Sequence, residues 1–172
     1  MALSKILSES LATGVGTGKF ESALLHVRDE KSNNTAGGGF TSGSFQTRTL
    51  NTVMTNEISG ASVATNQITL PSGTYFINAS CPAVFVNQHK AKLRNITDSS
   101  DTLIGTSEFS ANAIPDYVTT CSFVTGRFTI ASAKNFELQH RCTTTRGGDG
   151  FGNASNFAVV EVYTDVQIWK VA

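Results

Sequence analysis

The chain has 172 residues and no net charge at pH 7, and only 15% of its residues are charged. A chain of this length suits one domain, which can bury a core without help from a metal ion or a disulfide bond. Nucleic-acid-binding proteins normally carry a basic surface, so the charge balance argues against a nucleic-acid partner. The apolar runs are far shorter than the ~20 residues that a membrane span requires, which argues against membrane insertion.

The start of the chain differs in pattern from the rest. Four apolar residues recur at spacings of three and four and so fall on one stripe of a short helix: Leu3, Ile6, Leu7 and Leu11. A glycine-rich run over residues 14–18 then predicts a flexible linker. A helix this short is marginal in water unless it packs against something. Two interpretations stay open, a frayed terminus and an anchor peptide that docks on a partner protein.

From Phe20 onward the apolar residues alternate with polar ones, and a period of two indicates β-strands. The segment 62–70 is interpreted as a single strand with Ala64, Ile68 and Leu70 on one face. The strands expected in the first part of the chain cover residues 22–30, 46–50, 62–70, 74–83 and 89–97.

Three strongly alternating segments close the chain, at residues 118–130, 135–144 and 157–171. In the last segment one face is expected to carry Val160, Val162, Val166 and Ile168, and the other Tyr163 and Trp169. A strand whose second face meets water is usually polar there, so Tyr163 and Trp169 are candidates for a subunit interface, where aromatic residues are enriched. His140 is a third interface candidate, and a position in the core is its alternative.

The pattern divides the chain into an anchor peptide with its linker, residues 1–19, and one β-domain, residues 20–172. No segment after Phe20 has helical periodicity. Many short antiparallel strands in a domain of this size favour a sandwich or a jelly roll. We therefore predict an all-β antiparallel jelly-roll sandwich with a short N-terminal extension.

Several passages resemble a known fold family. Residues 68–77, Ile-Thr-Leu-Pro-Ser-Gly-Thr-Tyr-Phe-Ile, resemble the passage of an apolar strand, Gly-x-Tyr and a second apolar strand in C1q/TNF-like jelly-roll domains. Within that family the chain is similar to the small modules of phage fibres, head spikes and decoration proteins. The segments that carry this similarity are residues 43–51, 136–142, 150–152 and 162–170.

The resemblance implies a homotrimer in which one sheet of each subunit faces the threefold axis, with the C-terminal strand near it. It also implies a virion protein, made in the host cytoplasm, that serves as a trimeric head or tail appendage and attaches to host-surface carbohydrate. Residues 1–19 would then bind other virion proteins. Two alternatives stay open: a decoration or cement protein without a host ligand, and an extracellular C1q/TNF-like ligand. The start of the chain lacks the continuous apolar stretch of a secretory signal, which counts against the second alternative.

A glycine-rich loop over residues 143–152 joins two of the strongest expected strands. Arg146, Asp149 and Phe151 lie among glycines that let the backbone adopt positive φ. Arginine and aspartate can hydrogen-bond sugar hydroxyls, and an aromatic ring can stack on the apolar face of a sugar. These three residues are therefore the candidate carbohydrate site, with a long hairpin turn as the alternative interpretation.

No catalytic site, cofactor or metal site is expected. The histidines lie on separate segments, and spacing alone does not establish a catalytic triad. An odd number of cysteines without a C-x-x-C pair predicts buried free thiols rather than disulfides or a zinc site. Asp98 and Asp101 flank a Ser-Ser turn, for which Ca²⁺ ligation is the alternative interpretation.

A basic stripe lies on one face of an expected strand, at Lys90, Lys92 and Arg94. Acidic residues elsewhere in the chain balance its charge, so the stripe is interpreted as a solvated face. A contact with acidic glycans or with a capsid surface is the alternative.

Overall fold

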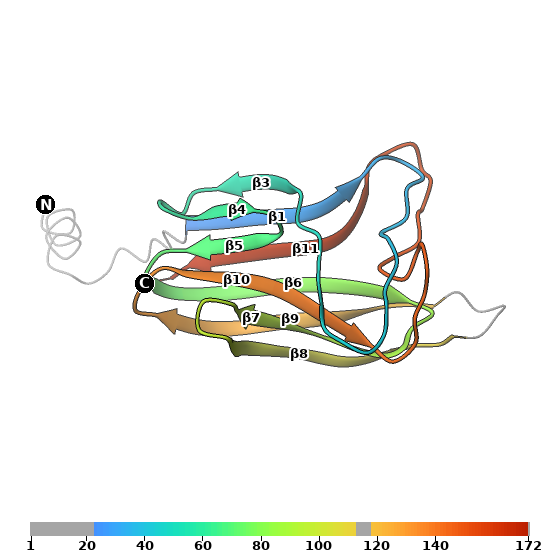
Figure 1. Ribbon diagram of the computed structural model, residues 1–172. Coiled ribbons are helices and arrows are strands. Elements are labelled where there is room, and N and C mark those ends of the chain that lie inside the picture. Colours follow the sequence, from blue (N-terminus) through green and yellow to red (C-terminus); the bar gives the residue numbers. More distant parts are fainter. Residues whose placement is uncertain (1–22, 113–117, 172) are drawn as a thin grey trace, which may run out of the picture.

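The computed structural model describes residues 23–112 and 118–171 (Figure 1). These residues form the strands β1 (Ala23–Lys31), β2 (Gln46–Thr47), β3 (Thr52–Asn56), β4 (Ser62–Ala64), β5 (Gln67–Leu70), β6 (Gly73–Val84), β7 (Asn87–Asn95), β8 (Ser100–Ser110), β9 (Thr119–Ile130), β10 (Lys134–Cys142) and β11 (Glu161–Lys170). Among the described residues there is no helix that could cross a membrane. The predicted anchor and its linker fall outside the described residues.

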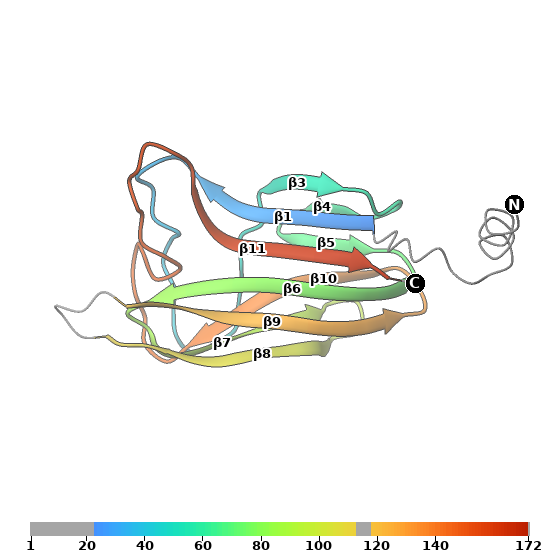
Figure 2. The ribbon, with the colours of Figure 1, turned by 180° about the vertical axis from the view of Figure 1, so that it is seen from behind.

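The strands form two antiparallel sheets packed face to face (Figures 1 and 2). One sheet has the order β3-β1-β11-β6-β9, and the other has the order β4-β5-β10-β7-β8, with β2 paired to β10. Because β1 pairs with β11, Ala23 lies opposite Lys170, and the described chain begins and ends at the same end of the sandwich. This arrangement confirms the predicted all-β jelly-roll sandwich.

The core lies between the two sheets and follows the alternation in the sequence. Leu25 and Val27 of β1, Tyr75 and Ile77 of β6, and Phe136 of β10 are fully buried. Burying a side chain of this size stabilises the fold by ~1.5–3 kcal/mol relative to leaving it exposed. A second, smaller cluster fills the sandwich near its loops and contains Phe40, Ala83, Val86, Cys142 and Phe151.

The segment predicted as one strand over residues 62–70 is a hairpin of β4 and β5. Its turn residues, Thr65 and Asn66, have φ of 49° and 65°. Positive φ at both central residues is the geometry that joins tightly paired antiparallel strands. Ile68 and Leu70 are buried as predicted, but Ala64 is exposed because the turn places it opposite Gln67, on the outer face, and sets Val63 opposite the buried Ile68 instead.

The last strand departs from strict alternation. Arg28 pairs with Asp165, whereas Glu30 pairs with Val162, so β11 holds one more residue than β1 between these pairs. A bulge of this kind reverses which face the following residues occupy. Val162 is therefore 41% exposed and Tyr163 is buried, opposite to the faces that the sequence predicts.

The three cysteines are free thiols, as predicted. Cys81 and Cys142 are buried, while Cys121 is partly exposed, which corrects the expectation that all three are buried. Burial raises the pKa of Cys81 to about 12 and that of Cys142 to about 11. Both thiols are therefore protonated at neutral pH and serve as small apolar side chains.

Arg48 is a fully buried cation that links three segments of the chain. Its Nε donates to Thr164 Oγ1 at 2.7 Å, and its terminal nitrogens donate to the carbonyls of Pro82 at 3.2 Å and Phe151 at 3.4 Å. Its guanidinium also lies 4.0 Å from the centre of the Phe151 ring. Burial lowers the pKa of Arg48 to about 10, and the buried carboxylate of Asp29 opposes this shift. Arg48 therefore stays charged at pH 7.

Candidate assembly face

The outer face of the sheet β3-β1-β11-β6-β9, which we call the assembly face, lies in front in Figure 2. Strand pairing sets its side chains in rows, because directly opposed residues lie on one face. One row crosses four strands and contains Leu24, Trp169, Phe76 and Arg127. The ring centroids of Phe76 and Trp169 are 6.1 Å apart. Phe76 remains 38% exposed, so the described part of the chain does not cover this aromatic pair.

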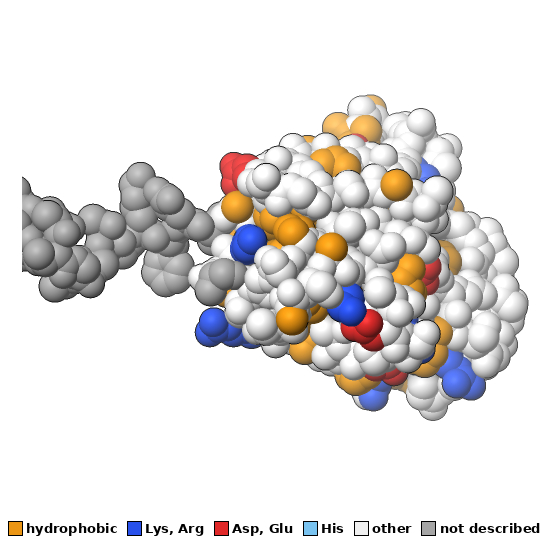
Figure 3. Space-filling model, turned by 60° about the vertical axis from the view of Figure 1, so that its left-hand side comes forward, with side chains coloured by type: hydrophobic (Ala, Val, Ile, Leu, Met, Phe, Trp, Pro, Cys, Tyr) orange, Lys and Arg blue, Asp and Glu red, His pale blue; other side chains and the backbone are white. Residues whose placement is uncertain are grey.

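More apolar surface lies on the same sheet. Phe123 of β9 is 47% exposed, and Val162 of β11 is 41% exposed. Figure 3 views the molecule from another side, toward the end of the sandwich where the described chain begins, and there too hydrophobic side chains lie among uncharged polar ones. Exposed apolar surface rimmed by polar residues marks a protein interaction site.

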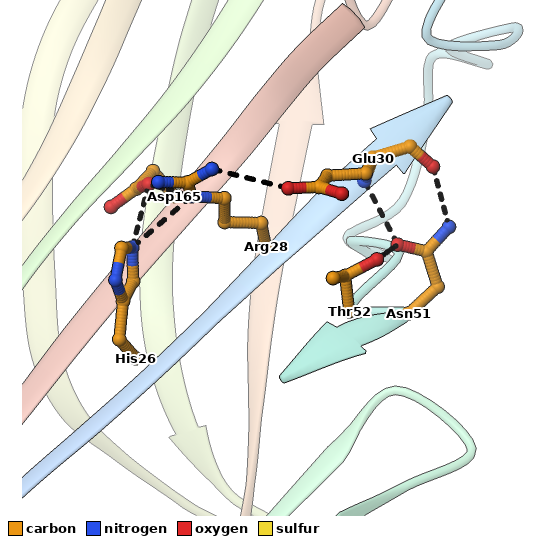
Figure 4. Close-up of polar contacts among 6 residues, drawn as sticks. All are labelled: His26, Arg28, Glu30, Asn51, Thr52 and Asp165. Carbon is orange, nitrogen blue, oxygen red and sulfur yellow. Dashed lines mark hydrogen bonds and ion pairs between the residues drawn. The ribbon is translucent and has the colours of Figure 1, made fainter. Parts of the chain in front are cut away.

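A polar network lies beside the aromatic row on β1, β3 and β11 (Figure 4). His26 Nε2 is 2.9 Å from Asp165 Oδ2, and Arg28 Nε donates to the same oxygen at 3.0 Å. Arg28 Nη1 also donates to Glu30 Oε1 at 3.1 Å, and Asn51 bonds the backbone of Glu30. Both carboxylates of this network already accept from Arg28, which lowers the cost of covering them with a second subunit.

Of the three predicted interface residues, only Trp169 reaches the assembly face. Tyr163 is buried within its own chain, where its hydroxyl donates to the Thr35 carbonyl at 2.7 Å. Its ring packs so closely on Gly152 that a Cβ added there would collide with it. His140 is also fully buried inside the chain. The assignment of Tyr163 and His140 to an interface is corrected accordingly: the bulge in β11 and the core position of β10 turn both side chains inward.

The predicted carbohydrate loop is held by contacts of its own. Arg146 and Asp149 form a two-point ion pair with distances of 2.6 and 2.9 Å, which lowers the pKa of Asp149. Phe151 is only 9% exposed, and its ring centroid lies 4.4 Å from that of Phe40. The Phe151 ring is therefore part of the core and is not open for stacking on a sugar, which corrects that prediction. A ligand role for Arg146 and Asp149 stays a prediction.

Two residues of the basic stripe pair with the Asp98–Asp101 turn. Asp101 accepts from both Lys92, at 2.9 Å, and Arg94, at 2.8 Å, and Asp98 pairs with Lys134 at 2.6 Å. Lys92 is thus paired and nearly buried rather than solvated. Within the described residues no group of three or more His, Cys, Asp or Glu side chains is placed to hold a metal ion.

A buried histidine pair lies between the two sheets near the loops. His89 Nδ1 is 2.9 Å from His140 Nε2, and His89 Nε2 is 2.7 Å from Thr120 Oγ1. His140 Nδ1 is buried and has no hydrogen-bond partner in the described chain. An unpaired buried N–H is rarer than an unpaired acceptor, so the geometry favours His140 Nε2–H as the donor to His89. Burial lowers the pKa of His89 to about 4 and that of His140 well below its usual value.

Acidification below pH 6.5 is expected to destabilise the protein through this pair. The unfolded histidines have the ordinary pKa of 6.5 and bind protons below that pH, whereas folded His89 stays neutral until the pH nears 4 and the pKa of folded His140 also lies well below 6.5. The free energy of unfolding therefore has its full value above pH 6.5. Below that pH it falls by up to ~1.4 kcal/mol per pH unit for each histidine. Urea unfolding between pH 7.5 and 4.5 measures this slope. His140→Phe, which keeps an aromatic ring beside Phe40, should flatten the slope, and an unchanged slope would contradict the assignment.

Comparison with known proteins adds information on the fold alone. No family model and no curated protein matches the chain. The solved structure of murine APRIL at pH 8.0 is similar, with a TM-score of 0.53, 7% identity, and coverage of 87% of this chain and 99% of that chain. The globular domain of zebrafish complement 1qA protein has a TM-score of 0.52 and 12% identity, and the match covers 88% of this chain and 98% of that chain. The chain thus has a C1q/TNF-like jelly-roll fold.

Proposed function

We propose that this chain assembles into a homotrimer through the assembly face and serves as a virion appendage that attaches to a host surface. The observation that carries the proposal is the half-exposed pair of Phe76 and Trp169 on a sheet that nothing in the described chain covers. Aromatic residues of this kind become anchors when a second subunit buries them. The C1q/TNF-like fold supports the trimer. The virion role is proposed on the sequence passages that resemble phage modules, residues 43–51, 136–142, 150–152 and 162–170.

The two ends of the sandwich suit different tasks in such an appendage. The described chain begins and ends at one end, so a segment preceding Ala23 is well placed to attach there. The loop before β11 lies at the other end (Figure 1) and exposes apolar side chains at Phe157, Val159 and Val160, with Phe157 79% exposed. This segment is a loop where the sequence predicts a strand.

The loop before β11 is held in place by one carboxylate. Glu161 accepts backbone N–H groups from three residues, Asn34, Ser155 and Asn156. These bonds lower the pKa of Glu161, so the carboxylate is charged at neutral pH. A fixed, apolar loop at the end away from Ala23 supports a recognition role, because an ordered loop loses little entropy on binding. Three such loops on one trimer would gain avidity over a single loop.

Deletion of residues 1–19 tests the appendage role. We expect the shortened protein to fold and to form trimers, because the described strands begin after this segment. It should fail to join virus particles, because the proposed anchor is gone. The measurement is the amount of full-length and shortened protein in purified particles, together with the mass of each free protein. Normal incorporation of the shortened protein would contradict the anchor.

Particles with and without the protein separate attachment from the cement alternative. An attachment protein, when removed, lowers adsorption to host cells and leaves the heat stability of the particle unchanged. Removal of a cement protein lowers the heat stability of the particle and leaves adsorption unchanged. The C1q/TNF-like ligand alternative predicts neither change, and it gains support only from the fold shared with murine APRIL and zebrafish complement 1qA.

A further inference from the structure

The outer face of the other sheet carries a cleft of about 430 Å³ over β7, β8 and β10. Its lining includes Phe45, Gln88, Lys90, Ser107, Arg141 and Thr143. In the strand register Lys90 of β7 lies opposite Arg141 of β10 on one side and opposite Ser107 of β8 on the other. These side chains therefore form one row across three strands. The cleft therefore lies on the sheet opposite to the assembly face and stays open in a trimer built through that face.

Two cations, Lys90 and Arg141, lie directly opposite each other on the paired strands that line this cleft. Like charges directly opposite each other on paired strands destabilise a sheet. Neither Lys90 nor Arg141 has an ion-pair partner among the described residues, whereas the next cation along β7, Lys92, pairs with Asp101. Glu108 also lines the cleft, so with the buried His89 neutral its lining carries a net charge of +1. A bound anion would relieve the repulsion between Lys90 and Arg141.

The cleft also holds an aromatic ring and an amide, two kinds of group that contact saccharides in proteins. Phe45 is 36% exposed, and the ammonium of Lys92 lies 4.0 Å from its ring centre, which fixes the ring in place. Thr143 Oγ1 donates to Gln88 Oε1 at 2.8 Å and so orients the Gln88 amide. The Gln88 NH₂ group, in the described chain, is left with no hydrogen-bond partner and can donate to a sugar hydroxyl.

We infer that this cleft binds an acidic saccharide, with its carboxylate or sulfate between Lys90 and Arg141 and a sugar ring stacked on Phe45. The inference rests on the attachment role proposed above and names its ligand class and its site. A neutral sugar would leave the two cations unpaired, and a bare anion would leave the aromatic ring unused. The net charge of +1 and the neutral chain do not suit a nucleic acid, which favours a larger basic surface.

Calorimetric titration of the full-length protein tests the site. The probes are trigalacturonate, a sulfated heparin hexasaccharide, neutral maltotriose and inorganic phosphate. We expect at least one acidic saccharide to bind with a Kd below about 10 mM and at least about tenfold more tightly than maltotriose or phosphate. Absence of acidic saccharide binding at that concentration would overturn the inference, as would equal affinity for phosphate.

Variants locate the binding. Lys90→Gln combined with Arg141→Gln is expected to weaken the acidic saccharide by about tenfold or more, since charge-assisted hydrogen bonds are lost. Phe45→Ala should weaken it as well. Lys134→Gln is the matched control, because it removes a cation from the far end of β10 and should leave the affinity unchanged. Unchanged affinity of the double variant for the acidic saccharide would overturn the assignment of the site. The mass of the trimer and its incorporation into particles do not depend on the cleft, so failure here is distinct from failure of the proposed function.

Discussion

Replacing Arg48 with alanine is expected to lower the free energy of unfolding by about 3–5 kcal/mol, the usual result of removing one partner of a buried charged network. The change removes the hydrogen bonds that Arg48 donates to Thr164 Oγ1 and to the carbonyls of Pro82 and Phe151. It also removes one cation near the buried carboxylate of Asp29, which keeps its ion pair with Lys31 at 2.7 Å. Urea unfolding at pH 7 and at one fixed protein concentration measures the loss, because the stability of an oligomer depends on concentration.

Two control variants show whether the loss of stability comes from the hydrogen-bond network, from the missing side-chain volume or from the missing charge. Arg48→Met keeps an aliphatic side chain in the same space and should recover part of the loss. Arg94→Ala removes a half-exposed arginine that pairs with Asp101 and should cost no more than about 1 kcal/mol. A loss at Arg48→Ala as small as that at Arg94→Ala would mean that the buried network does not hold these segments together.

Placing a charge on the assembly face is expected to convert the trimer into folded monomers. Phe76→Lys puts a cation beside Arg127, its pair on β9, at the centre of the proposed interface. Covering an unpaired charge costs several kcal/mol, which exceeds what a modest interface supplies. The side chain points away from the core, so the fold should be retained, as circular dichroism would show.

Phe45→Lys is the matched control for this variant. Phe45 is 36% exposed and Phe76 is 38% exposed, and each new lysine lies beside an existing cation, Lys92 or Arg127. The two variants thus differ mainly in the sheet face that they alter. We expect Phe45→Lys to keep the mass of three chains and Phe76→Lys to have the mass of one. Equal masses for the two variants would exclude the assembly face as the subunit contact.

Much of the fold follows from period-two patterning. In β1, β6, β9 and β10 the buried side chains follow the alternation of the sequence, because a strand that is buried on one face needs apolar residues at every second position. The pattern gives the wrong face or the wrong strand boundary where a bulge or a turn interrupts the alternation. The extra residue of β11 moves Tyr163 into the core, and the turn at Thr65 and Asn66 splits one apparent strand into two. Neither the extra residue nor the turn is visible in the hydrophobicity pattern of the sequence.

The candidate sites were harder to predict, because they depend on which strands are neighbours. Lys90 and Arg141 become partners only through the register of β7 and β10. Phe76 and Trp169 meet through the pairing of β6 and β11 in the same way. Composition marked Phe151 as a ligand residue, yet the Arg48 guanidinium and the Phe40 ring draw it into the core. Sequence spacing held no information on any of these contacts.

The native mass of the purified protein, measured by light scattering across a dilution series, tests the central claim most directly. A homotrimer built on the aromatic pair of Phe76 and Trp169 predicts a mass of three chains that persists on dilution. A mass of one chain at every concentration would contradict the trimer, and with it the avidity that the attachment role requires.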